Sequence, residues 1–205
     1  MPLVLLVAIA QAVGLYVKLP PFEQQPRNPI GVPMPSTPRA VYLVPIGSVP
    51  ETETTALVAH YRQKFGLPIT ALPAIEVAGG AYDEKRRQLV AERLIEALGR
   101  TPTASQDPQA ILIGLTMQDM YIADRLDWSY AFSLRSGGRF AVISTSRMSG
   151  GEFTNEDRRM RRIQKMITKN LGVLYYRLPQ SDDPGSVLFR NILGPDDLDR
   201  ASEAF

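Results

Sequence analysis

The sequence predicts an α/β domain with a mixed, mostly parallel twisted sheet, one antiparallel edge strand, long packed helices and a short C-terminal helix. Apolar runs at residues 41–46, 69–72 and 110–115 alternate with helical periodicities, which is the pattern of βαβ units. The last run, AILIGL, is continuously apolar, as in strands buried on both faces of a parallel sheet. A chain of 205 residues with 44% hydrophobic content is long enough for one domain with a sizeable core.

Composition excludes several classes of function. The formal net charge of +2 is close to balanced, so no nucleic-acid partner is expected. The chain has no cysteine and one histidine, which excludes disulfides and any zinc site built from several His or Cys ligands. We expect no cofactor.

The N-terminal residues 1–18 are predicted to be a signal peptide or an N-terminal anchor. Residues 3–17 are apolar apart from Gln11, and Lys18 follows them. The run is shorter than the ~20 residues of a spanning helix, and Ala10-Gln11-Ala12 is a possible cleavage site. This predicts a secreted, periplasmic or membrane-anchored protein that touches the membrane only through this segment if it stays uncleaved. The alternative is a buried first strand or helix in a cytoplasmic protein.

Residues 19–39 are predicted to be a linker, and residues 40–205 the folded domain. The linker contains seven prolines and little apolar periodicity, which favours an extended, semi-rigid spacer. The alternative is a strap along the domain surface.

The first predicted helix follows the strand at residues 41–46. Ser48 and Glu51 have the spacing of a capping box, and Leu57, Tyr61 and Phe65 share one face. Residues 66–68, Gly-Leu-Pro, end this helix.

A second strand is predicted at residues 69–72 and a second helix from about Asp83 to Gly99. Gly79-Gly80 breaks the chain between them, and Val90, Leu94 and Leu98 point inward. Residues 101–109 are a polar loop before the strand at residues 110–115.

Two further strands are predicted after residue 127. Residues 128–134 alternate in polarity, residues 136–138 form a turn, and residues 139–145 form a strand. We expect this last strand to be the edge of the sheet.

The longest helix is predicted to begin at Thr154, which forms a capping box with Asp157, and to stop at Pro179. Pro195 at a first helical position, followed by Asp196 and Asp197, predicts a short closing helix. One face of the long helix is apolar throughout: Met160, Ile163, Ile167, Leu171, Leu174 and Leu178.

Four blocks of this sequence resemble the archaemetzincins, a branch of the metzincin zinc peptidases. They are VPIG at 44–47, GLTMQDMY at 114–121, AVISTSRM at 141–148, and the long helix with the turn after it, to Asp197. The resemblance implies a metzincin-like zincin domain. It also implies a catalytic helix with the family pattern H-E-x-G-H-x-x-G-x-x-H.

The chain departs from that pattern at the residues that carry its chemistry. The three zinc histidines of the family fall on Lys169, Val173 and Pro179, and the general-base glutamate falls on Asn170. The later glycine, two cysteines and the methionine of the Met-turn fall on Tyr176, Gln180, Gly185 and Val187. Scaffold features are kept at Gly172, Asn191 and Asp197.

These replacements predict a protein without a zinc site. Valine and proline side chains offer no lone pair to a metal, and asparagine cannot take a proton from metal-bound water. We therefore expect a non-catalytic pseudopeptidase that holds a peptide or partner protein in the inherited cleft, with the edge strand at residues 139–145 available for strand addition. The alternatives are a hydrolase with a different active site, for example one of carboxylates, and a structural domain of an envelope assembly.

A basic stripe on the long helix is the other candidate feature. Its members Arg158, Arg162, Lys165 and Lys169 recur at helical spacing. With Tyr176, the last three are candidates for a ligand cleft that attracts a carboxylate or phosphate. The alternative is a solvated face balanced by Glu152, Glu156 and Asp157.

Other polar residues are predicted to have structural roles. His60 is expected to be a packing or surface histidine, and the serines in 144–149 lack a base. Asp182, Asp183, Asp196 and Asp197 could in principle supply calcium ligands, but turn and cap roles already explain them.

Overall fold

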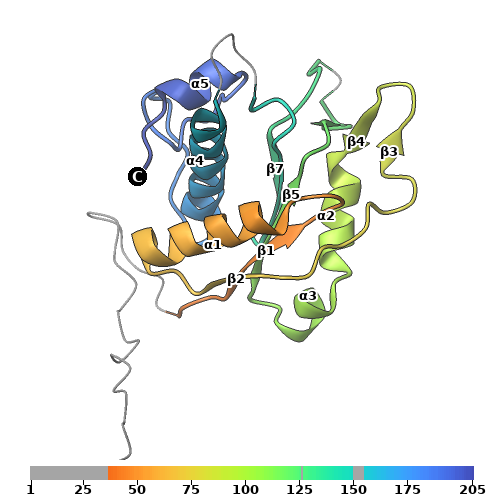
Figure 1. The fold of residues 1–205 in the computed structure, drawn as a ribbon, viewed down its shortest axis with the longest axis horizontal. Helices are drawn as coiled ribbons and strands as arrows, with labels where there is room; N and C mark the ends of the chain where they lie inside the picture. The colour runs from red at the N-terminus through yellow and green to blue at the C-terminus, as the bar shows by residue number, and fades with distance from the viewer. Residues whose placement is uncertain (1–36, 126, 150–154) are drawn as a thin grey trace, which may run out of the picture.

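A computed structural model of the protein describes residues 37–125, 127–149 and 155–205 (Figure 1). The predicted targeting segment 1–18 and most of the predicted linker 19–39 lie outside the described residues. Within the described ranges, no helix has the length and apolar character needed to cross a membrane.

The core of the fold is a five-stranded sheet in the order β2-β1-β5-β8-β7. Four strands are parallel, and β7 is an antiparallel edge strand, so the predicted sheet type is confirmed. The strands are β1 (Val41–Pro45), β2 (Ile69–Ala71), β5 (Ile111–Thr116), β7 (Ser133–Ser136) and β8 (Phe140–Ser144).

The identity of the edge strand was predicted wrongly. The strand expected at residues 139–145 is β8, which lies inside the sheet between β5 and β7. The edge is β7, because β8 already pairs with β5 on its other side. Gly137 and Gly138, with φ of 60° and 65°, turn the chain so that β7 and β8 form a hairpin.

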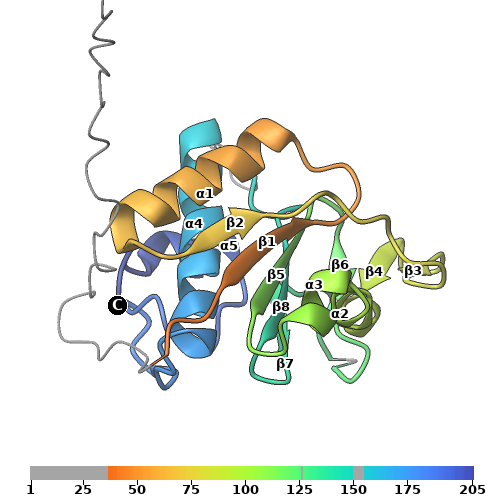
Figure 2. The same ribbon diagram turned by 90° about the horizontal axis from the view of Figure 1, so that it is seen from below.

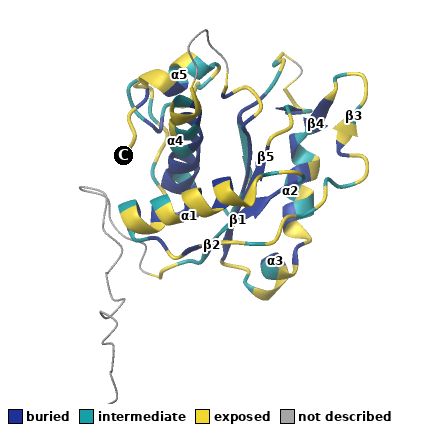
Figure 3. Ribbon diagram, viewed as in Figure 1, coloured by how far each residue is buried: buried dark blue, intermediate teal, exposed yellow. Residues whose placement is uncertain are grey.

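Helices cover both faces of the sheet (Figure 2). α1 (Glu51–Phe65) and α4 (Glu156–Leu174) cover one face, and α2 (Ala91–Gly99) covers the other. Side chains of β5 alternate between the two cores: Ile111 and Ile113 pack with α1 and α4, whereas Leu112 packs with α2. Figure 3 shows that α4 is buried along much of its length, whereas the outward side of α1 is exposed.

The start of α1 differs from the expected capping box. The N-cap is Pro50 and makes no side-chain hydrogen bond, while its carbonyl accepts from the N–H groups of Glu53 and Thr54. Gly66 ends the helix in the left-handed conformation, with φ of 61°, as predicted.

The second helix begins at Ala91, not at Asp83. The Asp83 carboxylate accepts from the N–H groups of Lys85 and Arg86, which forms a turn in place of the first helical residues. This turn joins β3 (Tyr82–Asp83) to β4 (Gln88–Val90), which pairs with β6 (Met120–Tyr121) in a small second sheet. The predicted loop at 101–109 contains a short helix, α3 (Pro102–Gln106).

The long helix α4 begins at Glu156 with Asn155 as its N-cap, and the predicted cap Thr154 lies outside the described residues. It ends at Leu174, before the predicted stop at Pro179. Arg177, with φ of 59°, turns the chain, and the N–H of Leu178 donates to the carbonyl of Gly172. The closing helix α5 (Pro195–Arg200) is confirmed.

Candidate functional site

A pocket of about 460 Å³ lies between the sheet edge and α4. Residues 127–135, which run into the edge strand β7, form one wall. Met166 and Lys169 of α4, with Gln180, Arg190, Ile192 and Leu193 of the segment after it, form most of the remainder. The edge strand, the long helix and the turn that follows it therefore converge on this pocket.

Lys169 lines this pocket and is 4% exposed. Its ammonium donates to the main-chain carbonyl of Phe189 and, at 3.4 Å, to that of Arg190. Burial, and next the positive charge of Arg135, lower the pKa of Lys169 to about 8. Hydrogen bonds from the Lys169 ammonium to these two neutral carbonyl oxygens thus hold α4 against the segment that follows it.

Asn170, the next residue of α4, is fully buried, and its side-chain amide both donates and accepts hydrogen bonds. Its Nδ2 donates to the Met166 carbonyl at 2.8 Å. Its Oδ1 accepts from Ser133 Oγ at 3.2 Å and from an Nη of Arg135 at 3.3 Å. Because both donors belong to β7, Asn170 fixes the helix against the edge strand.

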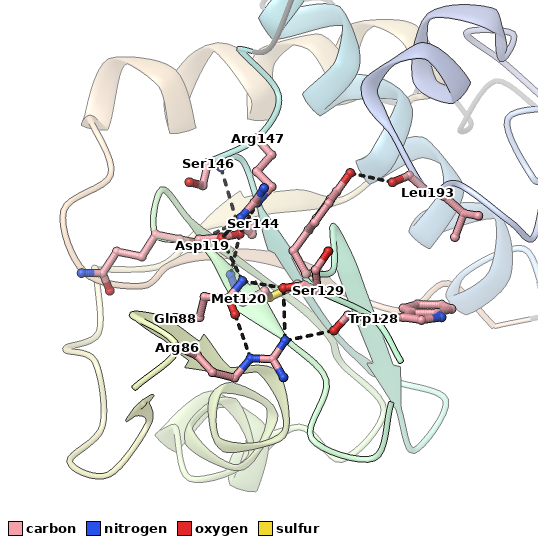
Figure 4. Close-up of polar contacts among 12 residues, drawn as sticks. Arg86, Gln88, Asp119, Met120, Trp128, Ser129, Ser144, Ser146, Arg147 and Leu193 are labelled. Atoms are coloured by element: carbon pink, nitrogen blue, oxygen red, sulfur yellow. Dashed lines mark hydrogen bonds and ion pairs between the residues drawn. The ribbon is translucent and has the colours of Figure 1, made fainter. Parts of the chain in front are cut away.

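The wall at residues 128–130 is held from behind by a polar network, shown in Figure 4. Arg86 donates to the carbonyls of Trp128 and Ser129, at 3.0 and 3.2 Å, and Gln88 also donates to the Ser129 carbonyl. On the other side, the Tyr130 hydroxyl donates to the Leu193 carbonyl at 2.6 Å and so joins two walls of the pocket.

Asp119 joins this network to the end of the sheet. It accepts from Gln88 at 2.9 Å and forms a two-pronged ion pair with Arg147, whose guanidinium stacks on the Tyr130 ring at 4.3 Å. The pair raises the pKa of Arg147. The contacts position backbone and rings, so we assign the network a structural role in shaping the pocket.

Two curated relatives of this chain are both named archaemetzincin. An archaemetzincin from Haloquadratum walsbyi is 31% identical over 109 residues, which cover 53% of this chain and 58% of that protein. An archaemetzincin from Natronomonas pharaonis is 29% identical over 139 residues, 64% of this chain and 76% of that protein. The chain is similar to archaemetzincins in sequence and in fold. No family model matches the chain.

Solved structures agree with the archaemetzincin fold. Archaemetzincin from Archaeoglobus fulgidus, crystallised with malonate, has a TM-score of 0.65 at 20% identity and covers 80% of this chain and 94% of that one. A zinc-dependent peptidase from Methanocorpusculum labreanum has a TM-score of 0.66 at 17% identity, covering 81% and 95%. The match thus spans most of both structures, whereas the sequence match spans just over half of the first curated relative.

The residues at the family's zinc positions do not fit a zinc ion. Lys169 points its ammonium at main-chain carbonyls, and Asn170 uses its oxygen to accept from β7. Val173 and Pro179 offer no lone pair. Among the residues that the structure describes, no three His, Cys, Asp or Glu side chains are grouped so as to hold a metal ion.

The other predicted cleft residues lie outside the pocket lining. Arg162 is 2% exposed and forms a two-pronged ion pair with Asp199, at 2.8 and 2.7 Å. Lys165 donates to the carbonyls of Leu198 and Asp199, and buried Tyr176 packs edge-on against Phe205. Arg162 and Lys165 therefore dock the C-terminal segment onto α4, whereas Lys169, the last member of the stripe, lines the pocket.

The remaining polar candidates have local contacts. His60 packs edge-on against Tyr61, and burial lowers the pKa of its imidazole. Asp183 accepts from the Gly185 N–H, and Asp182 pairs with Arg190. Asp197 caps α5 by accepting from the N–H groups of Leu193 and Gly194, so Asp183 and Asp197 have the predicted turn and cap roles, whereas Asp182 forms an ion pair.

Sequence reasoning missed Arg135, Ser133 and the aromatic wall of Trp128 and Tyr130. These residues reach the pocket because β7, not β8, is the edge of the sheet. A charged residue within an alternating strand was the available signal, since Arg135 shares a strand face with Ser133.

Proposed function

We propose that this archaemetzincin-like protein is a non-catalytic pseudopeptidase that binds an extended peptide, free or part of a partner protein, between β7 and α4. One observation carries the proposal: at the position of the family's first zinc histidine, the Lys169 ammonium is hydrogen-bonded to main-chain carbonyls. A cation placed there repels a metal dication rather than binding it. In addition, Asn170 occupies the position of the family's general base, and its side-chain amide cannot take a proton from metal-bound water.

The pairing pattern of β7 supports a peptide as the ligand. Ser144 N–H donates to the Phe132 carbonyl, and Leu134 and Ser136 lie opposite Val142 and Phe140. In an antiparallel pair, hydrogen-bonded residues alternate with residues whose main-chain groups point away from the partner strand. The N–H and C=O groups of Ser133 and Arg135 therefore point outward, where an extended peptide can pair with them.

The absence of zinc is tested by elemental analysis of the purified full chain. We expect zinc far below one equivalent, also after incubation with excess Zn²⁺ and desalting. The Methanocorpusculum labreanum zinc-dependent peptidase, purified in parallel, controls for loss of metal. Stoichiometric zinc that Lys169→Met or Asn170→Ala abolishes would overturn the proposal.

Peptide binding is tested by affinity selection from randomised, N-acetylated hexapeptides. Ser133→Pro removes one outward N–H without removing a bond of the β7–β8 ladder, so we expect selected peptides to bind roughly tenfold or more weakly. Ser133→Ala, which removes only the hydroxyl, should lose far less. Equal binding by the wild type and Ser133→Pro would contradict strand addition.

An extracytoplasmic location is part of the proposal and rests on the composition of residues 1–18. Fractionation of cells expressing the full chain with a C-terminal tag tests it. We expect the tag in the extracytoplasmic or membrane fraction, and deletion of residues 1–18 should return it to the cytoplasm.

A further inference from the structure

The pocket contains two cations that lack a carboxylate partner among the contacts of the described residues. Arg135 donates to the neutral amide oxygen of Asn170, and Lys169 donates to two main-chain carbonyls. By contrast, Arg190 in the same lining pairs with Asp182 at 2.6 Å. Asp127, the acidic residue of the lining, pairs with Arg125 at 3.5 Å.

The positive charges of Arg135 and Lys169 are therefore not balanced by a carboxylate of the described residues. Two positive groups that face one pocket raise each other's free energy, and burial removes part of the water that would stabilise them. Burial lowers the pKa of Arg135, and its charge adds to the burial effect on Lys169. An anion between the two groups would compensate both charges, and a carboxylate matches the planar guanidinium donors of Arg135.

We infer that the pocket recognises a carboxylate of the bound peptide through Arg135 and Lys169. This rests on the proposed function and adds the chemistry that selects the ligand. Arg135 contributes both its guanidinium and an outward main-chain edge, so a peptide paired with β7 passes directly beside the cations. The apolar side of the lining, with Trp128, Ile192 and Leu193, accommodates a neighbouring side chain of the peptide.

The carboxylate can come from the peptide C-terminus or from an Asp or Glu side chain, and three libraries distinguish these sources. All are N-acetylated hexapeptides. The first has a free C-terminus and no Asp or Glu, the second is its C-terminal amide, and the third is an amide library that includes Asp and Glu. The sole tryptophan of the chain, Trp128, lines the pocket, so its fluorescence measures the affinity of each selected peptide.

We expect peptides from the first or third library to bind at least roughly tenfold more tightly than their uncharged counterparts. Selection from the first identifies a terminal carboxylate, and selection from the third alone identifies a side-chain carboxylate. Arg135→Gln should abolish the preference, while Arg135→Lys keeps the charge and should retain part of it. Arg100→Gln, on an exposed side chain of the opposite helix layer, is the control for net charge.

The outcomes separate the two proposals. If all three libraries bind equally well, the carboxylate inference is wrong while peptide binding stands. If no library binds, peptide binding itself fails. Unchanged circular dichroism and urea midpoint of Arg135→Gln exclude misfolding, and a preference retained by this variant would overturn the role of Arg135.

Discussion

At the scale of single residues, Lys169 is the decisive side chain. It is held almost fully out of water and makes no ion pair with the described residues, because its ammonium donates to two carbonyl oxygens. A buried ammonium with only neutral partners is less stable in its charged form than one in water. The same position in the family pattern holds a neutral, metal-binding histidine, so the replacement puts a positive charge where the pattern has a neutral metal ligand.

Lys169 gives a pH dependence of stability with a defined sign. Its pKa falls from 10.5 to about 8 on folding, so between these values the unfolded chain binds more protons than the folded chain. The free energy of unfolding should therefore rise with pH across that window, by roughly 2 to 3 kcal/mol from this residue. Below pH 8, the buried ammonium of Lys169 lowers the free energy of unfolding by an amount that no longer changes with pH.

Urea denaturation at pH 7 and pH 10, for the wild type and Lys169→Met, measures this effect. Taking the difference between the two proteins cancels other groups that titrate in the range, such as exposed tyrosines. A wild type whose stability changes with pH in parallel with Lys169→Met would show that Lys169 has an ordinary pKa.

At the scale of elements, α4 is fixed by close packing at Gly172. A Cβ built there would lie 2.6 Å from Leu188 Cδ2 and 2.6 Å from Phe205 Cε1, well inside contact distance. Because Gly172 has no side chain, the helix and the C-terminal segment can approach each other closely at this position. Gly172 is also one of the scaffold features shared with the family pattern.

Gly172→Ala should lower the free energy of unfolding by about 1 to 3 kcal/mol, because the methyl group overpacks this contact. Chemical denaturation measures the change. Gly79→Ala is the matched control, since no atom lies within 4 Å of its added Cβ and its φ is not positive. Equal stabilities of the two variants would contradict the close packing.

The docking of α5 on α4 depends on the ion pair between Arg162 and Asp199. The guanidinium holds the pKa of the Asp199 carboxyl below its ordinary value of 3.8. This contribution is present above pH 3.8 and is lost as pH falls through the lowered pKa. Asp199→Asn should therefore cost about 1 to 2 kcal/mol at pH 7, a figure reduced for the partial exposure of Asp199.

Thermal unfolding of Asp199→Asn and of the wild type, at pH 7 and near pH 3, tests this. We expect the difference in midpoint to shrink at the lower pH. Asp196→Asn, an exposed position in the same helix, is the control. A difference that stays constant with pH would contradict an ion-pair contribution.

At the scale of the whole molecule, one sheet joins two hydrophobic cores. Strands β1, β5 and β8 each send side chains to both, as with Val41 and Val44, or Ala141 and Val142. Neither core can separate without exposing the side chains of the shared strands. The pocket lies at the border of this unit, where β7 leaves one edge uncovered by another strand.

We expect a single cooperative unfolding transition. Trp128 packs against the core on the α2 side, so its fluorescence follows that layer, while far-UV circular dichroism follows all helices. The two urea transitions should coincide. Fluorescence that changes at a lower urea concentration would show that the α2 layer unfolds separately.

Much of the fold could be predicted from residue patterns, and the failures share one cause. The apolar faces of α1 and α4 and the continuous strand β5 follow from periodicity, which local sequence carries directly. The start of α2 and the end of α4 were predicted wrongly, because each depends on a turn fixed by hydrogen bonds: the Asp83 turn and the left-handed Arg177.

Residue identity alone was enough to predict the α/β class, the resemblance to archaemetzincins and the chemistry of the side chains at that family's zinc positions. Which strand is the edge, and which cations face a pocket, became known from the three-dimensional fold. Strand order and side-chain burial depend on contacts between residues far apart in the chain, as between Asn170 and Ser133. For that reason Arg162, predicted for the cleft, binds Asp199, and Arg135, absent from the predicted site, lies in the pocket beside Lys169.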